Sequence, residues 1–289
     1  MTRGPYETRL DPALWAYIDA VNAWYPPEIL GLPIDKQRAV YDRMSRAFHQ
    51  GRPPGVKASD GLVTAAGRDI PVRRYRLAGK AAKAMVIYYH GGGFILGGLE
   101  SHDDICAELC AGTGFDVLSV DYRLAPEHVH PAAFDDAVAA FEWAAATSGL
   151  PLVLCGESAG GNLAAGSYIE HAHAPLLSVA DIAFYRDVRS AWRQSPDDPT
   201  FSPLRDTDFS GLPPTVIVTA QCDPLSSDGE TYRDRIVAAG GKAWWHEEPR
   251  LVHSFLRART SLPAAAAAFA RIVGAVGALG RGEWPTVER

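Results

Sequence analysis

Short apolar runs alternate with helical segments from residue 85 onward, and this alternation restricts the fold more than any other feature. Met85 to Tyr89 is a continuous apolar run, typical of a strand that is covered on both faces. Further strands are expected at 115–120, 152–155, 215–219 and 243–246, with helices at 101–110, 132–146, 228–239 and 263–276. Repeated alternation of this kind predicts an α/β fold with a mostly parallel, doubly wound sheet flanked by helices.

The first 54 residues follow a different pattern. Two amphipathic stretches, 11–25 and 34–49, are separated by prolines, and Asp11 followed by Pro12 is a typical helix start. We therefore expect an N-terminal helical appendage over residues 1–54 and a catalytic domain over 55–289. A half-exposed strand is expected near 72–77, where the domain begins.

Residues 162–213 interrupt the alternation. They contain one amphipathic helix, at about 179–192, and otherwise polar loop without an apolar strand-like run. The sequence therefore predicts a break in the regular succession of strands after residue 162.

Charge and composition exclude several classes of partner. The formal net charge is −6 and the basic residues are scattered, which argues against a nucleic-acid partner. No uncharged apolar stretch reaches about 18 residues and the N-terminus lacks a signal-peptide core, so we expect no membrane span and a cytoplasmic protein. Cys106 and Cys110 are expected to be buried thiols, and no metal or cofactor site is predicted.

Residues 156–160 read Gly-Glu-Ser-Ala-Gly and follow directly after a predicted buried strand. A nucleophile on a sharp strand-to-helix turn needs small neighbours, because the strand and the helix approach closely there. Ser158 is therefore a candidate nucleophile. The alternative is a glycine-rich turn with a solvated serine.

A glycine-rich segment, His90 to Phe94, follows the strand that ends at Tyr89. Acyl transfer places negative charge on a carbonyl oxygen, and backbone amides without an obstructing Cβ can approach that charge. Gly91 and Gly92, with Ala159 after the serine, are candidate oxyanion donors. The alternative is a flexible loop.

Candidates for the base and its orienting acid are His253 and Asp223. Both follow predicted strands, and they come after Ser158 in the order serine, acid, histidine. His246 is the main rival base, but we expect it to be held within the last strand. Asp228 is the rival acid, but it is expected to cap a helix.

Taken together, these motifs resemble those of the bacterial hormone-sensitive-lipase-like (family IV) esterases of the α/β-hydrolase superfamily. The resemblance rests on residues 90–94, 121–128, 131–134, 156–161, 223–225 and 253–255. It implies cofactor-free hydrolysis of small, short-chain carboxylic esters, with Ser158, Asp223 and His253 as triad and Gly91, Gly92 and Ala159 as oxyanion hole. It also implies that the N-terminal helices form the family's cap.

One departure from the family concerns the segment after Ala165. About thirty residues, including a central strand, are absent there, and a second cap segment over about 167–205 follows directly. The sheet could close up without the strand, another element or chain could cover the gap, or the sequence could omit a piece.

Two other functions use the same residues. A non-catalytic binding protein can be built on the hydrolase fold, and an amidase or acyltransferase would share the triad. The exposed edge expected at 243–246 is compatible with a homodimer.

Overall fold

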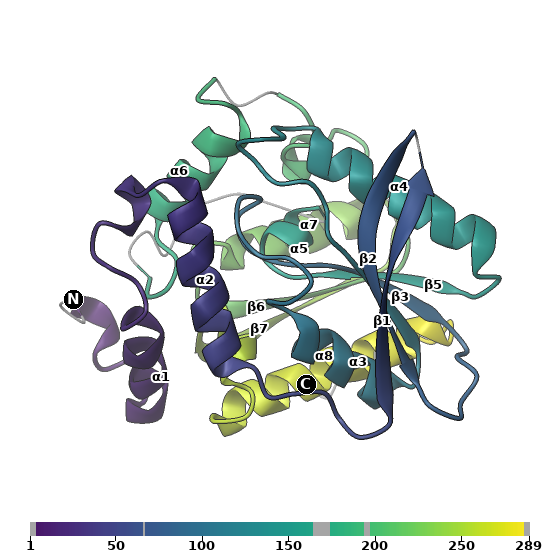
Figure 1. Ribbon diagram of the computed structural model, residues 1–289, viewed down its shortest axis with the longest axis horizontal. Coiled ribbons are helices and arrows are strands. Elements are labelled where there is room, and N and C mark those ends of the chain that lie inside the picture. The colour runs from purple at the N-terminus through teal and green to yellow at the C-terminus, as the bar shows by residue number, and fades with distance from the viewer. Residues whose placement is uncertain (1–3, 66, 164–173, 194–196, 286–289) are drawn as a thin grey trace.

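The computed structural model describes residues 4–65, 67–163, 174–193 and 197–285. Five strands form one sheet in the order β1-β2-β4-β3-β5 (Figure 1). Their bounds are β1 Val56–Ala65, β2 Arg68–Leu77, β3 Met85–Tyr89, β4 Asp116–Val120 and β5 Leu152–Gly156. β3 runs parallel to both of its neighbours, whereas β2 runs antiparallel to β1 and β4. The predicted α/β fold is confirmed, with an antiparallel pair at one edge.

Strand β1 was not predicted from the sequence. Only Val63 is buried among its ten residues, so the strand has no apolar alternation by which to recognise it. Its partner β2 supplies the buried positions of the pair. Pairing with β2 along its full length therefore decides its conformation.

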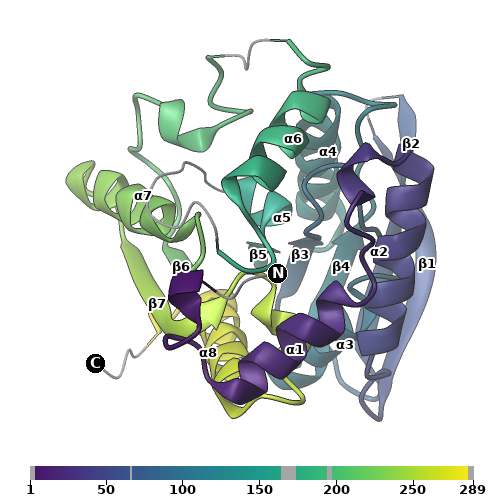
Figure 2. The same ribbon diagram turned by 90° about the vertical axis from the view of Figure 1, so that its left-hand side faces the viewer.

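The remaining strands, β6 (Thr215–Cys222) and β7 (Ala243–Val252), form a separate parallel pair. Figure 2 shows this pair set apart from the five-stranded sheet. Among the described residues no strand lies between β5 and β6, as the sequence predicted. Of the three alternatives left open by the sequence, closure of the sheet is not found among these residues, because β5 and β6 do not pair.

Helices cover both faces of the strands. α3 (Asp103–Thr113) and α8 (Pro263–Gly280) lie on one face, and α4 (Ala132–Thr147), α5 (Ala159–Asn162) and α7 (Ser226–Ala238) lie on the other (Figure 1). α8 contacts β3 and β5 of the larger sheet and β7 of the smaller one. It is therefore a packed connection between the two sheets.

Among the described residues, α8 is the one helix whose length and mean hydropathy, 1.5 over 18 residues, would suffice for a membrane span. Its buried residues include Ala268, Phe269 and Val276, which belong to the main core cluster. A helix packed on a sheet in this way serves as a core helix of the fold.

Helices α1 (Pro12–Asn22), α2 (Ile34–Phe48) and α6 (Val179–Arg189) lie together at one end of the sheets (Figure 2). The described part of the chain also contains four 3₁₀ turns: η1 Gly4–Tyr6, η2 Ile29–Gly31, η3 Pro203–Arg205 and η4 Phe255–Ala258. Asp11 caps α1, accepting the Leu14 amide at 2.9 Å, as the sequence indicated. Parts of the expected second cap segment, residues 167–173 and 194–196, lie outside the described residues, as does Ala165.

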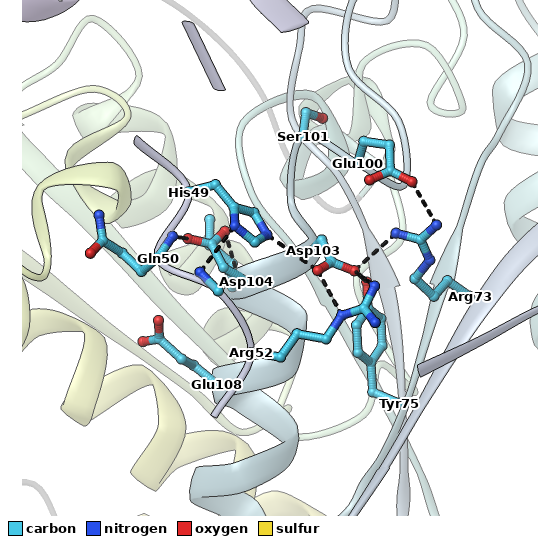
Figure 3. Close-up of polar contacts among 12 residues, drawn as sticks. His49, Gln50, Arg52, Arg73, Tyr75, Glu100, Ser101, Asp103, Asp104 and Glu108 are labelled. Atoms are coloured by element: carbon cyan, nitrogen blue, oxygen red, sulfur yellow. Dashed lines mark hydrogen bonds and ion pairs between the residues drawn. The ribbon is translucent and has the colours of Figure 1, made fainter. Parts of the chain in front are cut away.

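A cluster of charges around the buried Asp103 joins the end of α2 to the body of the protein (Figure 3). Arg52 donates two 2.8 Å hydrogen bonds to Asp103, and Arg73 and Tyr75 of β2 also donate to that carboxylate. Burial would raise the pKa of Asp103, but these donors and His49 outweigh it and lower the pKa to about 2. The N-terminal segment is thus attached at the first turn of α3.

The face of β5 beside the break is open to solvent. Leu154 is 54% exposed, whereas Leu118, in the middle of β4, is 1% exposed. A strand inside a complete doubly wound sheet is covered on both faces. The exposure of Leu154 therefore marks where a covering layer is absent from the described part of the chain.

These exposures predict different costs for the same substitution. Leu118→Ala is expected to lower the free energy of unfolding by about 2–5 kcal/mol, because it leaves a cavity. Leu154→Ala is expected to change it by less than about 0.5 kcal/mol, as for other exposed positions. Urea denaturation of both variants measures the difference, and a loss above about 2 kcal/mol at Leu154 would show that another element covers β5.

Candidate active site

Ser158 stands on a sharp turn between β5 and α5. Its backbone has φ 52° and ψ −116°, a conformation that a non-glycine residue rarely adopts. A Cβ on Gly160 would lie 2.0 Å from the Tyr89 carbonyl oxygen, and one on Gly156 would lie 2.4 Å from that of Gly160. Only glycine fits at either position, so the turn has the geometry of a nucleophile elbow.

Hydrogen bonds join Ser158, His253 and Asp223 in one chain. The Ser158 hydroxyl lies 2.9 Å from His253 Nε2, and His253 Nδ1 lies 2.7 Å from Asp223 Oδ2. With the Nδ1–H tautomer, the imidazole donates to the carboxylate and accepts the serine proton. The structure thus brings together all three residues proposed from the sequence.

The three residues follow strands of two different sheets. Ser158 follows β5, whereas Asp223 and His253 each follow the last residue of a strand in the β6–β7 pair. The carboxyl ends of parallel strands meet at one edge, where sites of α/β proteins are found. The hydrogen-bond chain therefore crosses the break between the sheets.

The electrostatic surroundings of His253 favour a charged imidazolium. Burial would lower the pKa of His253, but Asp223 and the nearby Glu157 outweigh it and raise the pKa above its ordinary value. A carboxylate that stabilises the imidazolium makes the neutral ring a stronger base.

The rivals weighed for these roles have other surroundings. His246 lies within β7, with its ring stacked on Trp244 and its Nε2 3.6 Å from Glu248. The expectation that Asp228 caps a helix is wrong, because α7 begins at Ser226 and Asp228 lies inside its first turn. Burial and the charge of Asp223 raise the pKa of Asp228 to about 8, so a neutral carboxyl prevails there at pH 7.

The glycine segment after β3 folds back on itself. The Gly92 carbonyl accepts hydrogen bonds from the amides of Ile95 and Leu96, at 3.1 and 2.9 Å. Gly92 has φ 126°, and a Cβ there would lie 2.1 Å from the Leu96 carbonyl oxygen. The segment thus forms a fixed turn that requires glycine, and not a flexible loop.

A buried histidine pair supports these two turns. The His90 ring stacks on Tyr122 at 4.2 Å between centroids and on His102 at 5.6 Å. His102 Nε2 lies 2.5 Å from the carboxylate of Glu157, the residue before Ser158. Burial raises the pKa of Glu157, but His102 and Arg257 outweigh it and lower the pKa to about 2. The sequence motif contains Glu157, but it does not reveal that His102, which lies far from Glu157 in the chain, is its partner.

Ser158 and His253 border a cavity of about 2340 Å³, which Gly91, Gly92 and Ala159 also line. Its volume exceeds the 300–1,000 Å³ usual for small-molecule sites. The described lining includes residues of α1, α2, the glycine segment, α6 and α7. Among the described residues, no group of three or more potential metal ligands occurs.

Comparison with known proteins places this site in a family. The model of a family with the α/β hydrolase fold matches residues 86–170 and 165–257. The chain belongs to this family.

Similar proteins include Carboxylesterase NlhH of Mycobacterium tuberculosis. It is 36% identical over 261 aligned positions, which cover 75% of this chain and 79% of the relative. Esterase LipI of the same species is 32% identical over 301 residues, covering 89% and 91% of the two chains. A solved ester-hydrolase from the Lake Arreo metagenome superposes with a TM-score of 0.85 at 31% identity, covering 93% and 99%.

The same comparisons indicate that this chain lacks positions that its relatives have. The match to NlhH runs over 261 positions, although 75% of 289 residues is only about 217, so about 44 positions fall on gaps in this chain. The family match also divides into two parts that meet at residues 165–170. Both observations agree with the break between β5 and β6.

The close packing of the serine turn makes a specific prediction. Gly160→Ala is expected to lower the melting temperature strongly or prevent folding, because its methyl group overlaps backbone that cannot move. The matched control Gly161→Ala places its nearest contact at 3.4 Å and is expected to fold. Thermal denaturation of the two purified variants checks this, and equal stability would contradict the turn described here.

Proposed function

We propose that the protein is a serine carboxylesterase acting on short-chain carboxylic esters. The chain of hydrogen bonds from Ser158 through His253 to Asp223 carries the proposal. Family membership and relatives named as carboxylesterases and esterases support it.

In the proposed mechanism, His253 removes the proton of Ser158 while the serine oxygen attacks the ester carbonyl carbon. The resulting tetrahedral intermediate collapses as His253 gives this proton to the leaving alcohol, and an acyl-enzyme remains. Water, deprotonated by His253, then attacks the acyl carbonyl carbon, and the second tetrahedral intermediate collapses with release of the acid as His253 returns the proton to the Ser158 oxygen. Asp223 holds the imidazole orientation and stabilises its positive charge throughout.

The amides of Gly91, Gly92 and Ala159 are proposed to stabilise the oxyanion. All three residues border the cavity beside Ser158, and the Gly92 turn is closed by its own hydrogen bonds. A donor held in place before the reaction needs no reorganisation when the charge develops.

Residues 1–54 and about 167–205 are proposed to form a cap over the domain at 55–289. Described parts of both segments, including Tyr25, Tyr41, Ile182 and Tyr185, line the cavity. These side chains would limit the length of the acyl group. The proposal also includes a cytoplasmic location and a homodimer, which cell fractionation and sedimentation can test.

The first test is hydrolysis of p-nitrophenyl acetate, butyrate and octanoate by the wild type and by Ser158→Ala. The variant is expected to lose at least about 10³-fold in kcat, because the covalent step is removed. A fluorophosphonate should label the wild type alone. A folded wild type without turnover or labelling would favour a binding protein, and turnover of amides or transfer to added alcohols would identify an amidase or acyltransferase.

The proposed base predicts the pH dependence. Since only the neutral imidazole accepts the serine proton, kcat/KM should rise with pH through the pKa of His253, which lies above the ordinary 6.5. In Asp223→Asn the rise of kcat/KM with pH should occur at lower pH, because the carboxylate that raises the pKa of His253 is gone. The maximal rate should also fall by about 10⁴. A rise at the same pH in both proteins would contradict the assignment of Asp223.

A further inference from the structure

The loop that carries His253 is fixed by side chains from outside the β6–β7 pair. Residues 253–258 follow β7 and include η4. Because the described β5 and β6 do not pair, backbone hydrogen bonds of the sheet do not set the distance between this loop and Ser158. Other contacts must therefore hold the base beside the nucleophile.

One of these contacts comes from the first N-terminal helix. The hydroxyl of Tyr17, on α1, donates a 3.0 Å hydrogen bond to the carbonyl oxygen of Ser254, the residue directly after His253. The same carbonyl also accepts the Arg257 amide at 3.3 Å. Tyr17 is 5% exposed, and its ring packs edge-on against Phe48 of α2 at 5.6 Å. The tyrosine is thus itself held firmly by both helices.

Ser254 is a position where such a contact matters. Its backbone is left-handed, with φ 61° and ψ 21°, a conformation that is unfavourable for a residue with a Cβ. A residue in this conformation keeps it only when its surroundings hold it. Rotation of the Ser254–Phe255 peptide, whose carbonyl Tyr17 holds, would change the backbone of the residue next to His253 and so move the imidazole relative to Ser158.

Two buried arginines attach the following turn to α2, to α3 and to the loop before α3. Arg257 donates to the Ser101 carbonyl and to the Tyr41 hydroxyl of α2, both at 3.0 Å. Arg259 pairs with Asp104 and Glu108 of α3 at 2.8 and 2.7 Å. These contacts anchor the loop away from His253, whereas Tyr17 acts one residue from it.

We propose that Tyr17 is a positioning residue, whose hydroxyl holds the Ser254 peptide so that His253 stays aligned with Ser158. The N-terminal helices then contribute to the alignment of the base as well as lining the cavity. The inference rests on the proposed esterase function for its kinetic test, but the position of His253 can be measured without turnover.

The kinetic experiment compares Tyr17→Phe with the wild type on p-nitrophenyl acetate, butyrate and octanoate. The variant keeps the ring that packs on Phe48 and loses only the hydroxyl. We expect kcat to fall about tenfold by the same factor for all three esters, with KM within about twofold, because general-base alignment is lost and not substrate contact. An unchanged kcat, or a loss that depends on acyl length, would overturn the proposal.

Tyr75→Phe is the matched control. Tyr75 is also a buried tyrosine with one hydrogen-bonded hydroxyl, donated at 2.8 Å to Asp103. It is expected to lower the melting temperature by an amount similar to that of Tyr17→Phe while kcat stays at the wild-type value. An equal fall in kcat in both variants would mean general loosening and would also overturn the proposal.

Histidine NMR titration supplies the readout that does not need turnover. The His253 resonance, identified by its loss in His253→Gln, should titrate at a lower pH in Tyr17→Phe, because a displaced ring loses part of its contact with Asp223. If the wild type hydrolyses no ester but this shift occurs, the function fails and the positioning role stands. Normal hydrolysis with no shift and no kinetic effect rejects the positioning role alone.

Discussion

The missing backbone pairing between β5 and β6 is the constraint on which the rest of this structure depends. In a continuous sheet, hydrogen bonds between neighbouring strands set the spacing of the loops at their ends. Here the serine loop belongs to one sheet and the acid and histidine loops belong to another. A distance of 2.9 Å between Ser158 and His253 must therefore be maintained by packing and by side chains.

Several kinds of interaction share this task. Helix α8 packs on β3 and β5 of one sheet and on β7 of the other, which is a large apolar contact. Arg259 adds a buried ion pair with Asp104. Removing one partner of such a pair is costly because the other charge stays buried without compensation. Apolar packing thus sets the approximate position of the β6–β7 pair relative to the larger sheet. The buried polar contacts then fix the His253 loop more closely.

The break also explains the exposed surface of β5. Leu154 would be covered in a complete sheet, and here water reaches it. Water can also hydrogen-bond to the half-exposed edges of β5 and β6, so their unpaired backbone groups do not carry the full cost of burial. The missing pairing between β5 and β6 is therefore less destabilising than the same loss inside a closed core would be.

The sequence by itself determined the α/β fold, the serine turn, the glycine segment and the order of the triad. These features depend on local patterns: apolar runs of strand length, glycines where a Cβ would collide, and motifs that resemble a known family. It also revealed the break after residue 162, because the pattern of strands stops there. It did not reveal β1, whose conformation comes from pairing with β2.

Only the tertiary structure decided which side chains hold His253 in place. Tyr17 and Ser254 are 237 residues apart in sequence, and His102 meets Glu157 across 55 residues. No spacing rule connects such residues, since their contact depends on how α1, α3 and the two sheets pack together. The candidate catalytic residues could therefore be proposed from local sequence motifs, whereas the alignment of their side chains depends on long-range packing.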